Sequence, residues 1–532
     1  MSSTTVTGPA DIPAPSVAAS EEAVDPKRMI AFVIMVFGMF MSILDIQIVS
    51  ASLSDIQAGL SASSTEVSWV QTAYLIAEVI AIPLSGFLSR AFGTRILFAM
   101  SAAGFTGASF MCGLTSDIDQ MILWRAVQGF LGAGMIPTVF ASAYTIFPRS
   151  KLPIVTPVIG LVATLAPTIG PTVGGYITDV MSWHWLFFIN VLPGIGVTLG
   201  VLALVDFDEP NLALLDHFDW FGLITMAGFL GAMEYVLEEG PQYQWFQDES
   251  VAIMGMICAV STVLFFWRVL TAKEPIVDIR AFTNRNFAIG SIFSFCVGIG
   301  LYGMTYMYPR YLAEVRGYSP VMIGETMFVS GLAMFVAAPL AGRLMTRLDP
   351  RYMIAAGLLI FAASTWQMTW ITRDFDFYEL LWPQIFRGVG IMLAMIPVNN
   401  IALGTLAPSM MKNASGLFNL TRNLGGAVGL ALINEVLNDR TDFHIDRLHD
   451  RMNWGSAAAV DLLNTLTQKF QGMGDAAMMA LKELSMIAHR QATVMAFGDA
   501  FYMLTFFYVG LSILVVFVNK PKAGAGAGGG AH

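Results

Sequence analysis

The sequence contains few charged residues. Only 12% of its 532 residues are Asp, Glu, Lys or Arg, whereas a soluble domain carries about 25%. This scarcity excludes a chain of several soluble domains, which the length alone would favour, because there is too little charge to cover a protein surface in water. The net charge of −10 lies mostly in connecting segments and therefore does not indicate binding to nucleic acid.

Residues that carry common chemistries are also scarce. Cys112, Cys258 and Cys296 lie within apolar runs without metal-ligand spacing, which indicates buried small side chains rather than a disulfide framework or a zinc site. The sequence has no glycine loop ending in Lys-Ser or Lys-Thr, which excludes an ATP-driven pump of the P-loop type. The six histidines lie in loops or at segment ends, away from any shared nucleophile. We therefore predict no enzyme, no metal and no cofactor.

Long apolar runs dominate the rest of the sequence. A membrane-spanning helix needs about 20 apolar residues, and this length predicts an all-α integral membrane protein with 14 transmembrane helices. The predicted spans lie near 29–52, 66–89, 96–116, 119–143, 152–178, 184–205, 219–238, 250–270, 286–311, 319–343, 352–372, 379–405, 412–436 and 496–518. Residues 1–28 are predicted to be a disordered tail, and residues 519–532 a second flexible tail.

The basic residues predict which side of the membrane the ends of the chain occupy. An even number of spans places both ends on one side, and the segments on that side hold most of the Lys and Arg residues. The short loops opposite hold only Arg310, Arg316 and Arg373. Because cytoplasmic loops are enriched in Lys and Arg, both termini are predicted to be cytoplasmic. Segment 206–219 is an exception, because it lies on the basic side without any Lys or Arg.

One segment on the opposite side, 437–495, is long and has helical periodicity in "AVDLLNTLTQKF" and "DAAMMALKELSMIAHR". Long translocated segments largely escape the charge rule. Two interpretations remain open for it: a solvated cap over the last two helices, or a docking surface for a partner.

Two weak internal repeats indicate a duplicated architecture. "GFLSRAFGTR" is echoed by "GRLMTRLDPR", and "RAVQGFLGAGMIP" by "QIFRGVGIMLAMIP", at nearly the same offset. Duplicated halves around a central site are typical of secondary transporters. We therefore predict a 6 + 2 + 6 arrangement: an N-terminal six-helix half at 29–206, two inserted helices at 207–285, and a C-terminal six-helix half at 286–518.

Ionisable residues inside predicted spans are costly and indicate a functional site. Asp45, Glu78 and Arg125 lie well inside spans of the first half, and Arg387 and Arg422 lie inside spans of the second half, where we expect them to be paired. The first three residues form either a structural polar network or a site where a carboxylate exchanges a proton for substrate. Glu234 and Glu325 lie nearer to span ends and are expected at the membrane interface, without an assigned role.

The fifth span contains "LAPTIGPTVGG", which is unusually rich in helix-breaking residues. Small residues let membrane helices approach closely, and prolines four residues apart remove backbone hydrogen bonds on one helix face. The stretch is therefore predicted to be a thin, closely packed hinge. Its residues are Pro167, Gly170, Pro171, Gly174 and Gly175.

Several of these motifs resemble those of one transporter family. "APTIGPTVGG" resembles the antiporter motif of major facilitator superfamily drug exporters, "GFLSRAFGTR" their loop 2–3 motif, and "LWRAVQGFLGAG" their fourth-span motif. "LDIQIVSASL" and "WHWLFFINVLPG" resemble motifs of the 14-helix drug/proton antiporters of the EmrB/QacA group. "EPIVDIRAFTNRNF" and the long segment before the last span resemble the EmrB type in particular.

The resemblance implies the major facilitator fold and proton-driven export of lipophilic drugs or toxic compounds across a bacterial inner membrane. It implies an EmrA-type periplasmic adaptor and a TolC-type outer-membrane channel as partners. Asp45 would be the coupling carboxylate and Arg125 its partner. The cytoplasmic gating loop would comprise Gly86, Arg90, Gly93 and Arg95, and the fifth-span residues would form the antiporter hinge.

Two departures from the family pattern leave questions open. The loop 2–3 motif usually has an acidic residue where Arg90 stands. The ion pair expected in this loop therefore lacks its acidic member. Glu78 occupies a position that is usually uncharged, so it would either change the proton stoichiometry or favour cationic substrates. Two alternative functions remain: export of one endogenous compound such as a siderophore, and a membrane receptor that does not transport.

Overall fold

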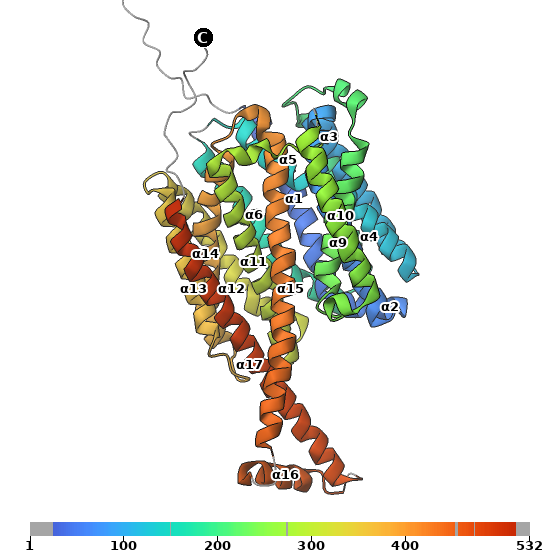
Figure 1. The fold of residues 1–532 in the computed structure, drawn as a ribbon, viewed down its shortest axis with the longest axis vertical. Coiled ribbons are helices and arrows are strands. Elements are labelled where there is room, and N and C mark those ends of the chain that lie inside the picture. The colour runs from blue at the N-terminus through green and yellow to red at the C-terminus, as the bar shows by residue number, and fades with distance from the viewer. Residues whose placement is uncertain (1–24, 149–150, 273–274, 453–455, 473, 518–532) are drawn as a thin grey trace, which may run out of the picture.

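The computed structural model describes residues 25–148, 151–272, 275–452, 456–472 and 474–517. This part of the chain contains helices and no β-strand, which confirms the all-α prediction (Figure 1). The predicted tails 1–28 and 519–532 lie outside it, except for the first helix turn. The α-helices are α1 (Pro26–Ala51), α2 (Leu53–Leu60), α3 (Ser64–Leu114), α4 (Ile118–Gly132), α5 (Met135–Ile146), α6 (Leu152–Val180), α7 (Trp185–Phe188), α8 (Val191–Leu204), α9 (Trp220–Glu239), α10 (Glu249–Thr271), α11 (Arg285–Glu314), α12 (Pro320–Met345), α13 (Pro350–Met368), α14 (Phe377–Leu403), α15 (Met411–Arg451), α16 (Ala457–Lys469) and α17 (Ala476–Leu514). Short 3₁₀ helices are η1 (Leu212–His217), η2 (Trp245–Gln247), η3 (Ile279–Thr283), η4 (Pro408–Met410) and η5 (Val515–Phe517).

Local sequence signals set many helix starts. Ser63 and Glu66 form a reciprocal capping box at the start of α3, and Asp376 does the same with Glu379 at the start of α14. Asp25 accepts a hydrogen bond from the Lys27 amide at the start of α1, where Pro26 occupies the first turn. These side chains satisfy amides that have no partner within the helix.

Eleven helices of the described residues are long and apolar enough to cross a membrane. Helix α3 is counted once among the eleven, but it covers the second and third predicted spans. These two spans meet at Gly93, where φ is +79° and a residue with a side chain would be strained. Helices α13 and α15 coincide with predicted spans but are not among the eleven. Fourteen transmembrane helices therefore remain a prediction, as do the boundaries of the two halves and the inserted pair.

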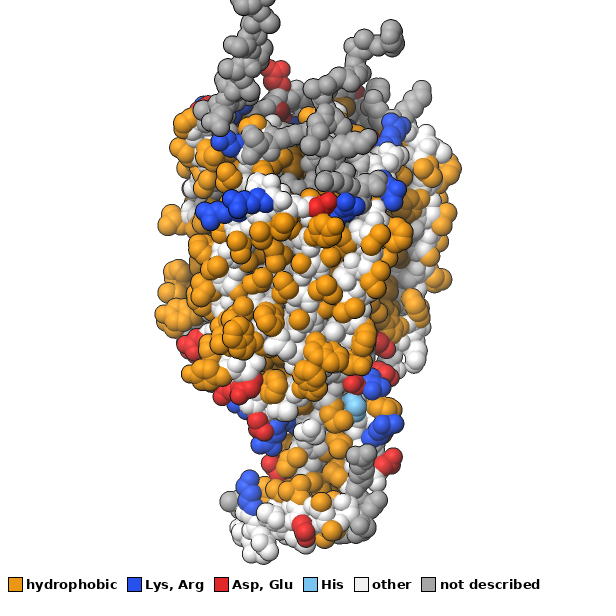
Figure 2. Space-filling view, turned by 90° about the vertical axis from the view of Figure 1, so that its left-hand side faces the viewer, with side chains coloured by type: hydrophobic (Ala, Val, Ile, Leu, Met, Phe, Trp, Pro, Cys, Tyr) orange, Lys and Arg blue, Asp and Glu red, His pale blue; other side chains and the backbone are white. Residues whose placement is uncertain are grey.

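The arrangement of the helices brings distant parts of the sequence together. Helix α6 packs against α1 and α12, and α15 packs against α3, α5 and α11. Helices α9 and α10 form a pair, in which α9 also packs against α3 and α15. Figure 2 shows a broad apolar belt with blue Lys and Arg side chains along the edge farthest from α16.

A helical stalk, defined as residues 437–495, projects beyond the belt. It consists of the C-terminal part of α15, α16 at the tip, and the N-terminal part of α17 (Figure 1). The two helical segments predicted from periodicity are confirmed as α16 and the start of α17. The stalk continues α15 and α17 away from the bundle. Both interpretations, a solvated cap on the last two helices and a docking surface for a partner, stay predictions.

Candidate functional site

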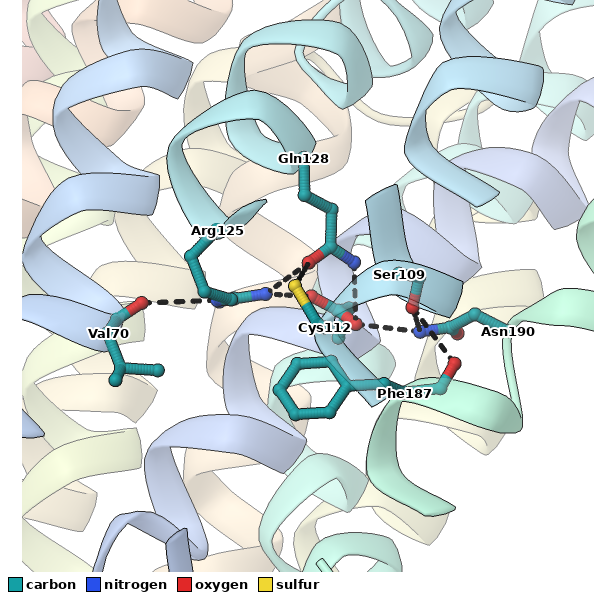
Figure 3. Close-up of polar contacts among 8 residues, drawn as sticks. Val70, Ser109, Cys112, Arg125, Gln128, Phe187 and Asn190 are labelled. Atoms are coloured by element: carbon teal, nitrogen blue, oxygen red, sulfur yellow. Dashed lines mark hydrogen bonds and ion pairs between the residues drawn. The ribbon is translucent and has the colours of Figure 1, made fainter. Parts of the chain in front are cut away.

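A buried carboxylate lies at the centre of the N-terminal helices. Asp45 on α1 has no exposed surface. Its Oδ2 accepts a hydrogen bond from Arg125 Nη1 on α4 at 2.6 Å. Its Oδ1 accepts hydrogen bonds from Gln128 Nε2 at 3.1 Å and from Asn190 Nδ2 at 2.7 Å (Figure 3). One cation and two amides thus replace the water that a carboxylate would otherwise bind.

Arg125 is equally buried and is oriented by several contacts. Its Nε donates to the Val70 carbonyl oxygen at 3.1 Å, and its Nη1 also donates to Gln128 Oε1 at 2.8 Å. The guanidinium carbon lies 4.2 Å from the centre of the Tyr74 ring. Its Nη2 has no hydrogen-bond partner among the described residues. Of the three guanidinium nitrogens, only Nη1 is therefore directed at Asp45 and its neighbour Gln128.

The structure adds three residues that the sequence did not single out. Gln128 lies three residues after Arg125, on the same face of α4. Asn190 precedes α8, and its Nδ2 also donates to Ser109 Oγ on α3 at 3.2 Å. The spacing of Gln128 from Arg125 was a usable signal, since residues three apart on a helix are neighbours. Asn190 lies in the stretch "WHWLFFINVLPG" that resembles a family motif, but nothing in the sequence assigned it to Asp45, and nothing distinguished Ser109 from a packing residue.

Glu78 lies outside this network. It lies on α3 and is 2% exposed, and its Oε1 has no hydrogen-bond partner in the described part of the chain. It lines a small cavity together with residues of α9, α11 and α15. The structure thus brings Asp45 and Arg125 together and places Glu78 at a separate site.

The glycines of α6 lie where other helices approach closely. A Cβ atom on Gly174 would lie 2.7 Å from the Ile48 carbonyl oxygen of α1, and one on Gly175 would overlap Pro320 of α12. Gly170 similarly faces Gln47. Helix α6 remains continuous through Pro167 and Pro171. Close packing of this stretch is therefore present, while hinge motion remains a prediction.

A central cavity of about 590 Å³ lies between α1, α3 and α6 on one side and α11, α12 and α15 on the other. It is lined by residues at the stalk end of the bundle, among them Ser54, Pro171 and Pro320. A second cavity of about 670 Å³ lies at the base of the stalk. The two cavities share Arg310 and Glu314, which form an ion pair at 2.8 Å.

The end of the bundle farthest from the stalk is held by an ion pair that the sequence did not predict. Lys412 of α15 pairs with Asp208, which lies in segment 206–219, and its Nζ donates to the Ser89 carbonyl oxygen at 2.9 Å. Asp208 Oδ1 accepts a hydrogen bond from the Thr94 amide at 2.9 Å. Asp208 therefore supplies the acidic group that the loop 2–3 motif lacks at Arg90.

The remaining residues of the loop 2–3 motif differ in their surroundings. Gly86 faces the backbone of α15, where an added Cβ would lie 3.0 Å from Asn413 Cα. Gly93 forms the turn inside α3, and Arg95 is exposed.

No described residue forms an ion pair with Arg387 or Arg422, which we expect to be paired inside the second half. Arg387 Nη2 donates to Thr305 Oγ1 at 2.9 Å, and Arg422 Nη2 donates to Asn419 Oδ1 at 2.5 Å. Their guanidinium carbons lie 5.5 Å from the ring centres of Tyr308 and Phe140, respectively. Hydroxyl, amide and aromatic groups hold these cations instead.

The two glutamates expected at the membrane interface differ in their surroundings. Glu325 is exposed near the start of α12. Glu234 is buried on α9 and lines the same small cavity as Glu78, because α9 turns this face toward α3 and α15.

Comparisons with known proteins agree on one family. The profile of the Major Facilitator Superfamily matches residues 35–430. The chain is 40% identical to the colistin resistance protein EmrB of Acinetobacter baumannii, over 92% of this chain and 96% of that protein. It is 28% identical to the multidrug export protein EmrB of Escherichia coli strain K12, over 93% of this chain and 96% of that protein.

Solved structures show the same fold. The human organic anion transporter MFSD10 aligns with a TM-score of 0.56 at 12% identity, covering 91% of this chain and all of that one (100%). A bacterial homologue of the human lysosomal transporter Spinster, in an inward-facing and occupied conformation, aligns with a TM-score of 0.52 at 14% identity, covering 93% and 98%.

Proposed function

We propose a mechanism for this chain, which belongs to the major facilitator superfamily and is a drug efflux permease of the EmrB type. The chain exchanges protons for lipophilic compounds by alternating access. In this proposal Asp45 carries the proton. Arg125 stabilises the deprotonated carboxylate, and Gln128 and Asn190 hold it in position.

The observation that supports this proposal most strongly is the isolation of the Asp45 carboxylate from water beside one permanent cation. Protonation of Asp45 removes the negative partner of Arg125, whose guanidinium stays charged. The attraction between α1 and α4 then weakens at the moment of proton binding. A proton can thereby bias the position of α1, which lines the central cavity, relative to α4.

The two ends of the bundle support an outward-facing state in this proposal. The central cavity has a volume typical of sites for drug-sized ligands, and it lies at the stalk end. The opposite end is closed by Lys412 and Asp208. The loop of Gly86, Arg90, Gly93 and Arg95 would act with this ion pair as the cytoplasmic gate, and the α6 residues Pro167 to Gly175 would act as the hinge.

The location and partners follow from the same premise. The protein crosses the membrane several times, and we place it in a bacterial inner membrane with both termini in the cytoplasm. The basic edge of the apolar belt lies at the end farthest from the stalk, as the positive-inside rule requires for this orientation. The stalk would then extend into the periplasm, where an EmrA-type adaptor would bind it and connect it to a TolC-type channel.

Uptake into inverted membrane vesicles tests this proposal. Energised vesicles should accumulate a fluorescent lipophilic drug, and a protonophore, which abolishes both the pH gradient and the membrane potential, should stop the accumulation. Accumulation that survives the protonophore would contradict exchange for protons.

A further inference from the structure

The small cavity beside Glu78 has an unusual lining. It has a volume of about 40 Å³ and is enclosed by residues of α1, α3, α9, α11 and α15. Three of its lining residues are glutamates: Glu78 on α3, and Glu234 and Glu238 one turn apart on α9. We call this cavity the side chamber. Its acidic wall consists largely of a helix that lies outside the two repeated halves predicted from the sequence.

Few cations compensate these carboxylates. Glu78 interacts electrostatically with Arg125 and with Arg422, but the Arg125 guanidinium is hydrogen-bonded to Asp45. Arg422 is buried, and its Nη1 has no hydrogen-bond partner. No Lys, Arg or His among the described residues forms an ion pair with Glu234 or Glu238. The charged groups that face these two are the acids Glu78 and Glu239.

The unpartnered oxygen of Glu78 indicates that the chamber is built to receive a ligand. Glu78 Oε1 is buried and has no hydrogen-bond donor among the residues that the structure describes, although buried carboxylate oxygens are normally satisfied. A donor placed in the chamber would satisfy it. Because Glu234 of α9 is also buried and lines the same chamber, a single cationic donor could contact carboxylates of α3 and α9 together.

The size and position of the chamber limit what this ligand can be. A water molecule needs roughly 10–15 Å³ by the same measure, so the chamber holds only a small group. It shares Tyr302 and Leu430 with the central cavity. The Tyr302 hydroxyl donates to Asn423 Oδ1 at 3.3 Å, which holds the ring between the two spaces. A group in the chamber can therefore belong to a molecule whose body lies in the central cavity.

We propose that the side chamber binds the primary ammonium group of an amphiphilic amine whose apolar body occupies the central cavity. This inference rests on the proposed export function and assigns α9 a part in substrate recognition. An ammonium group donates three hydrogen bonds from a compact positive charge, which suits carboxylates on facing walls. A quaternary or aryl cation is too bulky for the chamber and would bind in the central cavity alone.

Matched ligands test the proposal by binding. The probes are 1-adamantylammonium, its neutral counterpart 1-adamantanol, and tetraphenylphosphonium, whose charge is shielded by four rings. Calorimetry on the full-length protein in lipid nanodiscs, corrected with empty nanodiscs, should show about tenfold or more preference for the ammonium over the alcohol. The Glu234→Gln/Glu238→Gln variant should lose that preference and bind tetraphenylphosphonium unchanged. Glu325→Gln, at an exposed carboxylate of α12, is the matched control and should behave as wild type.

Two results would overturn the inference: equal binding of ammonium and alcohol by the wild type, or an undiminished ammonium preference in the double variant. Proton flux evoked by tetraphenylphosphonium in proteoliposomes tests the export function separately. Its absence from the wild type would contradict antiport, while the binding data would still decide whether the chamber recognises ammonium groups.

Discussion

At the scale of single residues, Asp45 and Arg125 depend on each other. Each is buried without access to water, and each is the principal charge partner of the other. Removing one member of such a pair leaves an uncompensated charge in a medium of low polarity, which is more costly than removing both. The folded state therefore requires both charges of this pair to be present together, and the proposed proton exchange at Asp45 requires the same.

We expect Asp45→Asn to lower the free energy of unfolding by about 3 kcal/mol or more, because it leaves the Arg125 guanidinium without a negative partner. Asp45→Asn/Arg125→Gln should regain most of that loss, since the second change removes the stranded charge. Thermal unfolding in one detergent, followed by tryptophan fluorescence, measures both. A double variant less stable than the single one would show that the pair does not stabilise the fold in this way.

Asp376 gives a residue-scale prediction outside the membrane. The Tyr318 hydroxyl donates to its carboxylate, and this bond, with the Phe377 amide and Arg316, lowers the pKa of Asp376. A lowered pKa in the folded state stabilises the protein above the unfolded pKa of about 3.9, and this contribution is lost as pH falls through the lower folded value. Asp376→Asn should therefore reduce the unfolding temperature by about 1–3 °C at pH 7, because the group is exposed.

The difference between this variant and the wild type should narrow as the pH falls below the unfolded pKa of about 3.9, because the wild-type carboxyl becomes increasingly protonated. A difference in unfolding temperature that is as large at pH 3 as at pH 7 would rule out this linkage.

How far the residues of the site could be predicted depended on their charge. Asp45, Glu78 and Arg125 stand out because charge inside an apolar run is costly. Asn190 and Gln128 complete the same network, but neutral amides leave little trace in hydropathy. The partnership of Asp208 with Lys412 joins positions 204 residues apart, and no local pattern could connect them.

At the scale of helices, the glycines of α6 set the distance between neighbouring segments. Gly174→Ala should lower the free energy of unfolding by about 1–3 kcal/mol, because the new methyl group would press on the Ile48 carbonyl of α1. Gly196→Ala on α8 is the matched control, since a Cβ there meets nothing within 4 Å. Equal unfolding temperatures for the two variants would show that the approach of α6 to α1 is not tight.

The ion pair between Lys412 and Asp208 gives a second prediction at this scale. Losing a partly exposed ion pair costs about 1 kcal/mol, so Asp208→Asn should shift the population of the closed gate about fivefold toward opening. Spin labels at Arg95→Cys and Arg347→Cys, in a background without native cysteines, report the distance across this end of the bundle. Asp216→Asn, an exposed acid in the same segment, is the control. Identical distance distributions for both variants would exclude a gating role for the pair.

Helix existence was easier to predict than helix continuity. The length of apolar runs located the spans, because a membrane imposes that length. The run from Ser64 to Leu114 forms one element with a turn at Gly93, and α15 continues unbroken from the bundle into the stalk. A helix continues past the membrane surface when it has a packing partner there. The extension of α15 has such a partner, because it packs against α17.

At the scale of the whole molecule, we expect the helix bundle to carry out transport and the stalk to bind the partner protein. Replacing residues 452–474 with a short Gly-Ser linker removes α16 while leaving the bundle, the central cavity and the Asp45 network untouched. We expect transport in proteoliposomes to remain within about twofold of wild type, while drug resistance of intact cells falls at least about tenfold, because avidity for a partner is lost. Equal losses in both assays would indicate that the tip is needed for transport itself.

The proposed drug export depends on proton exchange at Asp45, which substrate-evoked proton flux measures. The wild type, Asp45→Asn and Asp45→Glu would be reconstituted in liposomes with an imposed pH gradient and a trapped pH-sensitive dye. Addition of tetraphenylphosphonium should evoke proton flux in the wild type, partial flux in Asp45→Glu, which keeps a titratable group, and none in Asp45→Asn. Undiminished flux in folded Asp45→Asn would contradict the assignment and place the coupling at another carboxylate.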